Sequence, residues 1–201
     1  MPIWWPIPVA ATFLLSAWLT PLARMVAVRF GVVDAPDGGR KQHGGVTPLL
    51  GGLAIVAGFV IPLVIVLLST DHLTSGSITM RHFVGFLIGV GILTVTGVLD
   101  DRFAMSAKYS MVFFAIASLA AVAGGIEVSK ITNPLGGVIV LAPVAASIVA
   151  FVWIIAMTMT TKLLDGVDGL AASISAVASL MIAALALTPT YFQSDVALLA
   201  L

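Results

Sequence analysis

Two close pairs of aspartates carry the chemistry that this sequence offers most clearly. Asp100 and Asp101 are adjacent and end a long apolar run, and Asp165 and Asp168 lie between two further apolar runs. Neighbouring carboxylates repel one another unless a cation compensates their charge, and acids at the border of a membrane segment are candidates for a functional site. We therefore interpret the two pairs as a Mg²⁺-diphosphate site. The alternative, that acids only cap or cover helix ends, suits one isolated aspartate better than two pairs.

A segment rich in glycine and proline between the first two apolar runs carries side chains that could hold phosphate. It reads GVVDAPDGGRKQHGGVTPLLGG and contains Arg40, Lys41 and His43. Arginine can bind phosphate oxygens through two parallel hydrogen bonds, and lysine binds them as a point charge. We interpret these three residues as phosphate-binding candidates, with His43 included only because of its neighbours.

The composition places these residues in a membrane protein. Hydrophobic residues make up 60% of the chain and charged residues 9%, whereas about a quarter of the residues of an average soluble domain are charged. The net charge is +0, so the chain lacks the basic footprint of a nucleic-acid-binding protein, and no nucleic acid is expected as a partner. The absence of cysteine excludes disulfides, thiol catalysis and cysteine-ligated metals.

We predict an all-α fold, a polytopic transmembrane helical bundle that forms one membrane domain over residues 1–201. A helix needs about 20 apolar residues to cross the hydrocarbon core, and this requirement predicts six complete spans plus the start of a seventh near Val196. The predicted spans are 3–23, 46–68, 82–99, 109–126, 138–159 and 170–187.

Two residue patterns inside these spans bear on helix packing. Pro62 and Pro143 fall within predicted spans and would kink them. Gly85 and Gly89 have the GxxxG spacing that can mark a helix contact, although ordinary packing of small residues is the preferred explanation.

Basic residues predict the orientation of the bundle, because cytoplasmic loops carry an excess of Lys and Arg. Seven of the nine basic residues flank the first, third and fifth loops, namely Arg24, Arg29, Arg40, Lys41, Arg102, Lys108 and Lys162. Only Arg81 and Lys130 lie on the other side. We therefore expect an N-terminus outside and the odd-numbered loops in the cytoplasm, which would bring both aspartate pairs and the glycine-rich loop to one membrane face. For Arg24 and Arg29, orientation alone is an equally good explanation.

The motifs together resemble those of a known family of membrane enzymes. GVVDAPDGGRKQHGGVTPLLGGLAI, GVLDDRF and TKLLDGVDGLAA are similar, in this order, to segments of the bacterial polyprenyl-phosphate sugar-1-phosphate transferases of glycosyltransferase family 4. The resemblance covers most of the chain. It is greatest to the branch that makes undecaprenyl-diphospho-N-acetylglucosamine, and phospho-MurNAc-pentapeptide transferase is a more distant relative.

The resemblance implies a reaction and its participants. Such an enzyme moves a sugar-1-phosphate, typically N-acetylglucosamine-1-phosphate, from a UDP-sugar onto undecaprenyl phosphate at the cytoplasmic face of the inner membrane and releases UMP. The product initiates a cell-envelope polysaccharide, such as lipopolysaccharide or teichoic acid, in cell wall biogenesis. The expected partners are a polyprenyl phosphate lipid, a UDP-sugar and the lipid bilayer, with assembly into a homodimer left open. The expected cofactor is Mg²⁺, with Mn²⁺ as an alternative.

The resemblance also implies roles for individual residues. The expected catalytic residues, which would bind metal or deprotonate the lipid phosphate, are Asp100 and Asp101. The expected metal ligands are Asp165, Asp168 and Asp101. The expected residues that bind substrate phosphate are Lys41, Arg40, His43 and Lys162. These assignments agree with the preference of Mg²⁺ for carboxylate and phosphate oxygens, and with the dependence of phosphoryl transfer on positioning and charge neutralisation.

The chain departs from the family pattern at several places. Ala104 stands where a third acid usually follows DDRF, and Met159 and Lys162 stand where asparagines usually precede the DGxDG motif. Family members are also longer, with later cytoplasmic loops that help to bind the sugar nucleotide, whereas this sequence ends at Leu201 within an apolar run. We therefore expect a fragment of a larger bundle, or a truncated or degenerate relative, with little activity on its own.

Three other classes of protein compete with this interpretation. A non-catalytic relative is the strongest alternative because of Ala104 and Met159. A transporter would more often place its acids at mid-membrane within broken helices. A CDP-alcohol phosphotransferase is disfavoured because GLAASISAV, which follows Asp168, lacks the Ala-Arg pair and the later aspartates of that family's motif.

Overall fold

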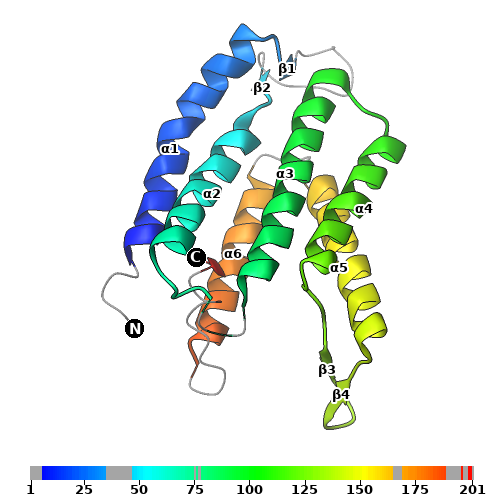
Figure 1. Cartoon of the computed structure of the whole chain (residues 1–201). Coiled ribbons are helices and arrows are strands. Elements are labelled where there is room, and N and C mark those ends of the chain that lie inside the picture. Colours follow the sequence, from blue (N-terminus) through cyan, green and yellow to red (C-terminus); the bar gives the residue numbers. More distant parts are fainter. Residues whose placement is uncertain are drawn as a thin grey trace. The chain divides into compact units, whose positions relative to one another are not determined.

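The computed structural model describes residues 6–34, 47–74, 76, 78–164, 169–188, 196 and 199–200. Over these residues the chain folds into helices and two short antiparallel hairpins (Figure 1). The elements are α1 (Pro6–Arg29), β1 (Val33–Asp34), β2 (Thr47–Pro48), α2 (Gly51–Ser69), α3 (Met80–Phe103), α4 (Ala107–Ala123), β3 (Lys130–Thr132), β4 (Val138–Val140), α5 (Pro143–Leu164) and α6 (Leu170–Ala186).

The helices are those of a membrane bundle, which confirms the predicted fold class. Within the described residues, α1, α2, α3 and α5 are long and apolar enough to cross a membrane, and α4 and α6 are shorter apolar helices. Large apolar side chains cover their outer surfaces; Phe13 is 72% exposed and Leu68 is 80% exposed. Helices that are apolar on all sides require an apolar environment, so the chain is a multi-pass membrane protein. The expectation of six complete spans and a seventh stays a prediction.

Several helices extend beyond the predicted spans because backbone hydrogen bonding continues past the charged residues at which the predicted spans end. Helix α1 ends at Arg29 rather than at residue 23, so Arg24 and Arg29 belong to the helix and do not flank it. Helix α3 likewise continues from residue 99 to Phe103 and includes the acidic pair. Helix α2 begins only at Gly51, because Thr47 and Pro48 form a strand instead.

The prediction that a span covers residues 138–159 was wrong at its beginning. Val138–Val140 is strand β4, paired with Lys130–Thr132, and α5 starts at Pro143. Proline suits the first position of a helix because its missing N–H would have no partner there and its φ angle is already helical. Pro143 therefore starts α5 and does not kink it. Pro62 does lie inside α2, as predicted.

The chain divides into two compact units. Unit 1 comprises residues 1–71 and 93–110, and unit 2 comprises residues 72–92 and 111–201. Helices α3 and α4 each contribute to both units. The expectation of a single membrane domain stays a prediction.

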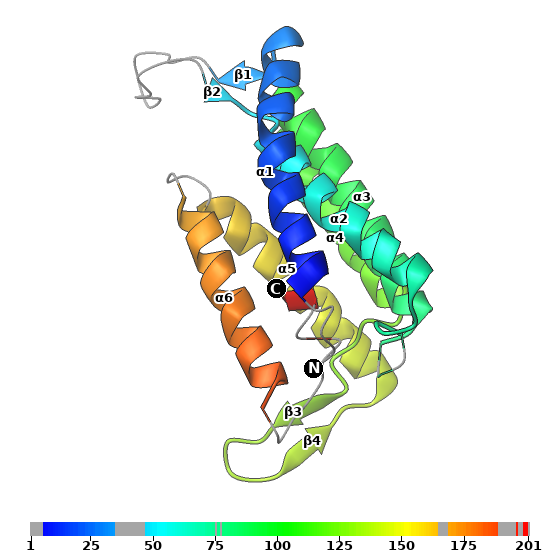
Figure 2. The ribbon, with the colours of Figure 1, turned by 90° about the vertical axis from the view of Figure 1, so that its left-hand side faces the viewer.

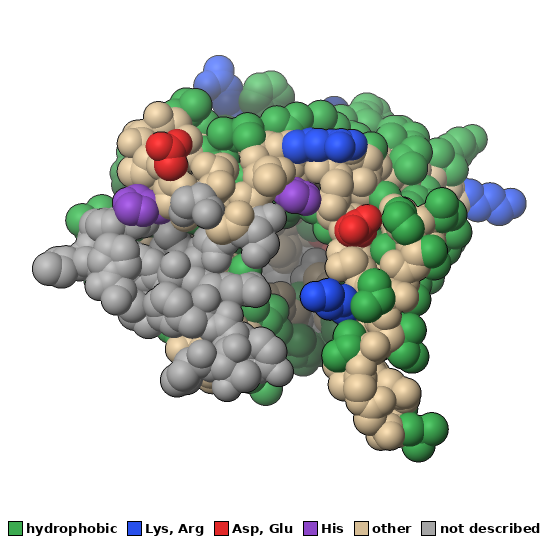
Figure 3. All heavy atoms as spheres, turned by 60° about the horizontal axis from the view of Figure 1, so that its bottom comes forward, with side chains coloured by type: hydrophobic (Ala, Val, Ile, Leu, Met, Phe, Trp, Pro, Cys, Tyr) green, Lys and Arg blue, Asp and Glu red, His purple; other side chains and the backbone are tan. Residues whose placement is uncertain are grey.

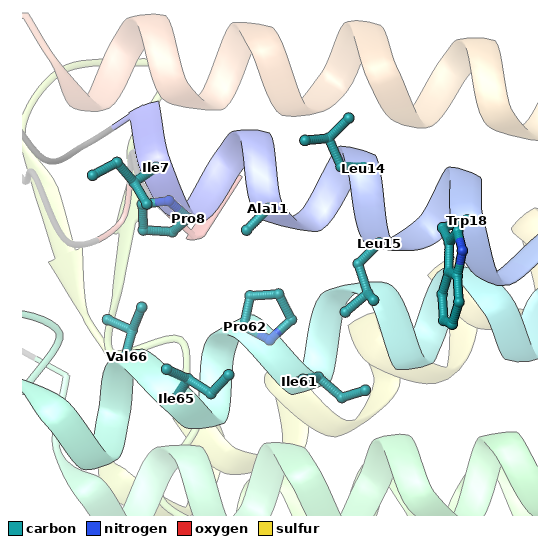
Figure 4. A pocket seen from close by; sticks show the side chains of 10 residues that line it. All are labelled: Ile7, Pro8, Ala11, Leu14, Leu15, Trp18, Ile61, Pro62, Ile65 and Val66. Carbon is teal, nitrogen blue, oxygen red and sulfur yellow. The ribbon is translucent and has the colours of Figure 1, made fainter.

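In unit 1, α1 and α2 pack against each other in antiparallel directions. A Cβ atom on Gly58 would collide with the side chain of Ser16 and would lie 2.8 Å from its Cα atom, so only glycine allows this crossing. Towards the beginning of α1 an apolar groove opens between the two helices, lined by residues that include Leu15, Trp18 and Ile65 (Figure 4). A groove with this lining suits contact with lipid.

In unit 2, the beginning of α3 packs closely against the end of α4. A Cβ atom on Gly85 would lie 2.6 Å from the Cα atom of Gly124, and one on Gly89 would lie 3.1 Å from the carbonyl oxygen of Ala117. The GxxxG pair therefore does mark a helix contact, contrary to the preferred explanation of ordinary packing.

Two polar side chains of α3 reinforce this contact. Arg81 donates a hydrogen bond to the carbonyl of Ala123 at 3.0 Å. The Nδ1 atom of His82 accepts the N–H of Thr79 at 2.9 Å, so its Nε2 atom carries the proton and donates to the carbonyl of Gly125 at 3.1 Å. The first turn of α3 is thus tied both to the residue that precedes it and to the end of α4.

The helix contact predicts opposite effects for the same substitution at two glycines of α3. Gly85→Ala should lower the free energy of unfolding by about 1–3 kcal/mol, the usual cost of overpacking, because the new methyl group would meet backbone atoms of α4. Gly91→Ala is the matched control. A Cβ atom there has nothing within 4 Å, and alanine favours a helix over glycine by about 1 kcal/mol.

Thermal unfolding in detergent, followed through the fluorescence of the four tryptophans, would measure both effects. An equal or higher melting temperature for Gly85→Ala than for Gly91→Ala would contradict the close contact.

Candidate functional site

The acidic pair lies in the last turn of α3. Asp100 and Asp101 are both helical and partly buried. Successive residues of a helix lie about 100° apart around its axis, so the two carboxylates leave adjacent faces of α3. The C-terminal end of a helix carries a partial negative charge, which disfavours acids there. Asp100 and Asp101 therefore do not cap a helix start, whereas the alternative that they cover a helix end stays open.

Ala104 ends α3 in an unusual backbone conformation. Its N–H donates to the carbonyl of Asp100 at 2.8 Å, and its φ angle is +47°, in the left-handed region. This conformation costs a residue with a Cβ atom about 1–2 kcal/mol, whereas glycine, asparagine and aspartate adopt it more readily. The position where the resembling family has an acid is thus one whose backbone suits aspartate better than alanine.

Asp34 and Thr47 flank the glycine-rich loop and form its root, which lies beside the end of α3. Asp34 in β1 pairs with Thr47 in β2, so the residues that flank the segment 35–46 lie side by side (Figure 2). Just before this hairpin, the N–H of Val32 donates to the carbonyl of Ala27 at 2.8 Å. The predicted phosphate-binding residues Arg40, Lys41 and His43 lie outside the described residues.

A small apolar cluster fixes this arrangement. Ala27, Val32 and Leu50 are buried together, and Val98 of α3 packs against them. Arg102 lies one helical turn beyond Val98 and therefore shares its face of α3. Its guanidinium lies 3.9 Å from the position that a Cβ atom on Gly31 would occupy. Unit 1 thus brings the acidic pair, one arginine and the root of the basic loop together.

Arg102 is the site residue that sequence reasoning missed, because it was considered only for membrane orientation. Its position four residues after Val98 was the available signal, since that spacing puts both residues on one face of α3. A basic residue in the last helical turn also counters the negative end of the helix.

Lys162 lies in the last turn of α5, in unit 2. Its Nζ atom is 5.4 Å from the centroid of the Phe114 ring, within the range of about 6 Å for a cation–π contact. Phe114 is buried in the N-terminal half of α4. Helices α4 and α5 therefore run antiparallel, and α5 ends beside the half of α4 that follows the end of α3. The metal-ligand candidates Asp165 and Asp168 come directly after α5 and lie outside the described residues.

The described residues supply at most two carboxylates of α3 for the expected metal ion. Among the described residues, no three His, Cys, Asp or Glu side chains are grouped so that they could hold a metal ion. Mg²⁺ in phosphoryl-transfer sites is usually bound through one or two carboxylates plus substrate phosphates and water. Asp100 and Asp101 supply donors of this kind.

The left-handed position of Ala104 predicts a stabilising substitution. Ala104→Gly should raise the free energy of unfolding by about 1 kcal/mol, because glycine removes the steric cost of a left-handed backbone. Ala176→Gly, at an exposed position inside α6, is the matched control and should lower it by about 1 kcal/mol through lost helix propensity. Chemical unfolding in mixed micelles would compare the two variants. A destabilised Ala104→Gly protein would show that the left-handed turn costs nothing.

Comparison with known proteins gives consistent relatives. The model of the family described as glycosyl transferase family 4 matches residues 83–201. A probable undecaprenyl-phosphate N-acetylglucosaminyl 1-phosphate transferase of Bacillus subtilis (strain 168) is 31% identical over 170 residues, which cover 85% of this chain and 45% of that protein. An undecaprenyl-phosphate alpha-N-acetylglucosaminyl 1-phosphate transferase of Yersinia pestis is 33% identical over 82% of this chain and 42% of that protein.

A decaprenyl-phosphate N-acetylglucosaminephosphotransferase of Mycolicibacterium smegmatis (strain ATCC 700084 / mc(2)155) is 29% identical over 85% of this chain and 41% of that protein. The chain thus spans less than half the length of these curated relatives. No solved structure matches it. Because the family model covers more than half of its residues, the chain belongs to glycosyl transferase family 4.

Proposed function

We propose that this chain belongs to an enzyme that transfers N-acetylglucosamine 1-phosphate from UDP-N-acetylglucosamine to undecaprenyl phosphate and releases UMP. The names of two relatives state an acceptor lipid, undecaprenyl phosphate, and a sugar phosphate, N-acetylglucosaminyl 1-phosphate. The observation that carries the proposal is the partly buried Asp100–Asp101 pair at the end of a membrane helix, beside the root of a basic loop. Neither a soluble glycosyltransferase nor a simple membrane anchor would need this combination.

The proposed reaction joins two anions, and the site must offset their repulsion. An oxygen of the lipid phosphate attacks the phosphorus that carries the sugar, the bond from this phosphorus to the UMP oxygen breaks, and UMP leaves. Bound Mg²⁺ would supply charge neutralisation for the diphosphate. Asp101, with Asp165 and Asp168, would hold the ion, and Asp100 would accept a proton from the lipid phosphate. These roles use the acids where α3 meets the membrane border.

Basic residues would position the phosphates in this proposal. Arg40, Lys41 and His43 belong to the segment between Asp34 and Thr47, which pair with each other in β1 and β2. Lys162 comes three residues before Asp165 and would also contact substrate phosphate. Arg102 would keep the root of the loop beside the acids, through its position next to Gly31.

A non-catalytic member of the same family is the alternative function, and two residues favour it. Ala104 and Met159 stand where the resembling enzymes usually have an acid and an amide. Under this alternative the chain would bind the lipid phosphate without transferring the sugar phosphate. The two functions therefore share a binding step and differ in turnover.

The binding step gives a test that does not depend on turnover. Undecaprenyl phosphate should bind the purified chain more tightly with Mg²⁺ than with EDTA, and Asp101→Asn should remove this difference because one metal ligand is lost. A lost hydrogen bond to a charged group costs about 1.5–3 kcal/mol, or roughly a tenfold to hundredfold loss of affinity. Asp71→Asn is the matched control, since Asp71 follows the opposite end of α2. Equal losses in both variants would contradict the proposed metal site.

Turnover is measured separately with radiolabelled UDP-N-acetylglucosamine. We expect little transfer by this chain alone, because the matched region is less than half of each relative and catalysis depends on holding both reactants in place. Transfer that Asp101→Asn abolishes would favour the enzyme over the non-catalytic member. Binding without transfer that Ala104→Asp converts into turnover would identify Ala104 as the limiting residue.

We further propose that the acidic end of α3 faces the cytoplasm of a bacterial cell and that the N-terminus lies outside. The excess of basic residues in the odd-numbered loops supports this orientation. An impermeant maleimide should label Gly39→Cys only after permeabilisation, and Gly76→Cys in intact cells. The absence of native cysteine makes both reactions specific. The reverse pattern would invert the proposed topology.

A further inference from the structure

Lys162 lies against an aromatic ring that no role described so far requires. Its Nζ atom is 5.4 Å from the centroid of the Phe114 ring, and both residues belong to unit 2. A lysine in the last turn of a helix counters the negative end of that helix, and it fits the excess of basic residues in cytoplasmic loops. These two effects explain a lysine at the end of α5, but they do not explain its contact with a ring.

The ring of Phe114 is held in place by the packing of α4. Phe114 is 7% exposed. The other buried residues of its helix face follow three, four and seven positions later and are Ala117, Ser118 and Ala121. Helix α3 approaches closely here, since a Cβ atom on Gly89 would lie 3.1 Å from the carbonyl oxygen of Ala117. A ring in such a packed face keeps its position, whereas a lysine has a flexible four-carbon stem, so the ring orients the lysine.

An aromatic partner suits a lysine that has to bind an anion. A ring attracts an ammonium through its quadrupole, and because the ring carries no net charge, it leaves the positive charge of the lysine in place. The contact uses one side of the ammonium, so N–H donors on its other sides can reach phosphate oxygens. A stem that is held before the anion arrives also loses less conformational freedom on binding. The ring can thus orient the cation and still leave it available.

The place of Lys162 in the chain gives the oriented charge a use. Asp165 and Asp168, the acids that the proposed function assigns to the metal ion, come three and six residues later. Phosphoryl transfer depends on holding phosphate groups in place and on neutralising their charge. We propose that Phe114 is a positioning residue, whose ring holds the Lys162 ammonium at the end of α5 so that it binds a phosphate group of the substrate. This inference rests on the proposed function and adds to it a residue that acts on substrate through another side chain.

Nuclear magnetic resonance tests the contact itself in the full chain in micelles. With ¹³C at the ε carbon of every lysine, the ε-CH₂ protons of Lys162 should be shifted upfield by the ring current of Phe114, and Phe114→Leu should remove this shift. Phe113→Leu is the matched control, since it removes the neighbouring ring of α4, about 100° away around the helix axis. Lys130 is the reference signal, because it is exposed in the hairpin that projects from unit 2 (Figure 3) and residues 115–150 contain no aromatic side chain.

Affinity for undecaprenyl phosphate in the presence of Mg²⁺ tests the positioning role. Lys162→Gln should lower the affinity roughly tenfold to hundredfold, as expected for a lost hydrogen bond to a charged group. Phe114→Leu should lower it roughly twofold to tenfold, through the lost cation–π contact, and Phe113→Leu should leave it unchanged. In the Lys162→Gln background, Phe114→Leu should cause no further loss.

A fluorinated ring separates positioning from packing, because Phe114 is buried and Phe114→Leu also changes the core. Incorporation of 3,4,5-trifluorophenylalanine at position 114 withdraws negative charge from the ring face with little change of shape. It should lower the affinity for undecaprenyl phosphate as Phe114→Leu does, while the melting temperature stays that of the unsubstituted chain. The same residue at position 113 should change neither quantity.

The outcomes distinguish failure of this inference from failure of the proposed function. A Lys162 signal without the upfield shift would overturn the inference, and so would an affinity that falls in Lys162→Gln but not with the fluorinated ring; both results leave the proposed function standing. Unchanged affinity in Lys162→Gln would remove this lysine from the site and overturn the inference with it. Absence of Mg²⁺-dependent binding by the unsubstituted chain would overturn the proposed function and the inference that rests on it, even where the shifted lysine signal is present.

Discussion

The packing of Val98 against Ala27, Val32 and Leu50 determines which groups meet at the acidic end of unit 1. This cluster joins three segments that are far apart in sequence: the end of α1, the start of α2 and the last turns of α3. Its residues are small or branched, and they pack together where the helices of unit 1 meet their connecting loops. The Asp100–Asp101 pair and the root of the basic loop are neighbours because this contact joins α3 to the end of α1 and the start of α2.

The charges of these neighbouring groups bear on the proposed function. Two partly buried carboxylates at the negative end of a helix repel each other and the helix dipole. Positive charge near them, including that of the proposed divalent metal with bound phosphate, would lower this repulsion. The segment between Asp34 and Thr47 carries Arg, Lys and His in its sequence. In the proposed function these basic residues would add positive charge for a polyanionic substrate.

Sequence reasoning predicted the fold class well, and its errors have physical causes. Hydropathy reports where contact with lipid ends, whereas a helix ends where its hydrogen bonds stop, so α1 and α3 continue past the apolar runs to Arg29 and Phe103. The run Val138–Val140 is equally apolar as helix or strand, and only the pairing with Lys130–Thr132 decides between them. The closeness of Gly85 to Gly124 could not be predicted either, since GxxxG spacing identifies a face of one helix and not its partner.

The sequence predicted the residue types and motifs of the candidate site, but not how these residues are arranged. The sequence placed Asp100 and Asp101 at a membrane border, but it left open whether they lie at a helix start or a helix end, and this difference changes the sign of the dipole interaction. Arg102 was missed as a site residue because the four-residue spacing from Val98 shows only that the two share a face of α3, and not that this face meets the α1–β1 turn.

At Ala104 the backbone conformation and the charge of the side chain can be considered separately. The helix stops there through a left-handed residue and a hydrogen bond to the carbonyl of Asp100, and both features are independent of the side chain. Replacing an acid by alanine at this position therefore removes a carboxylate and keeps the turn. In the proposed function, two acids in place of three at the end of α3 would repel substrate phosphate less and would attract a metal ion less strongly.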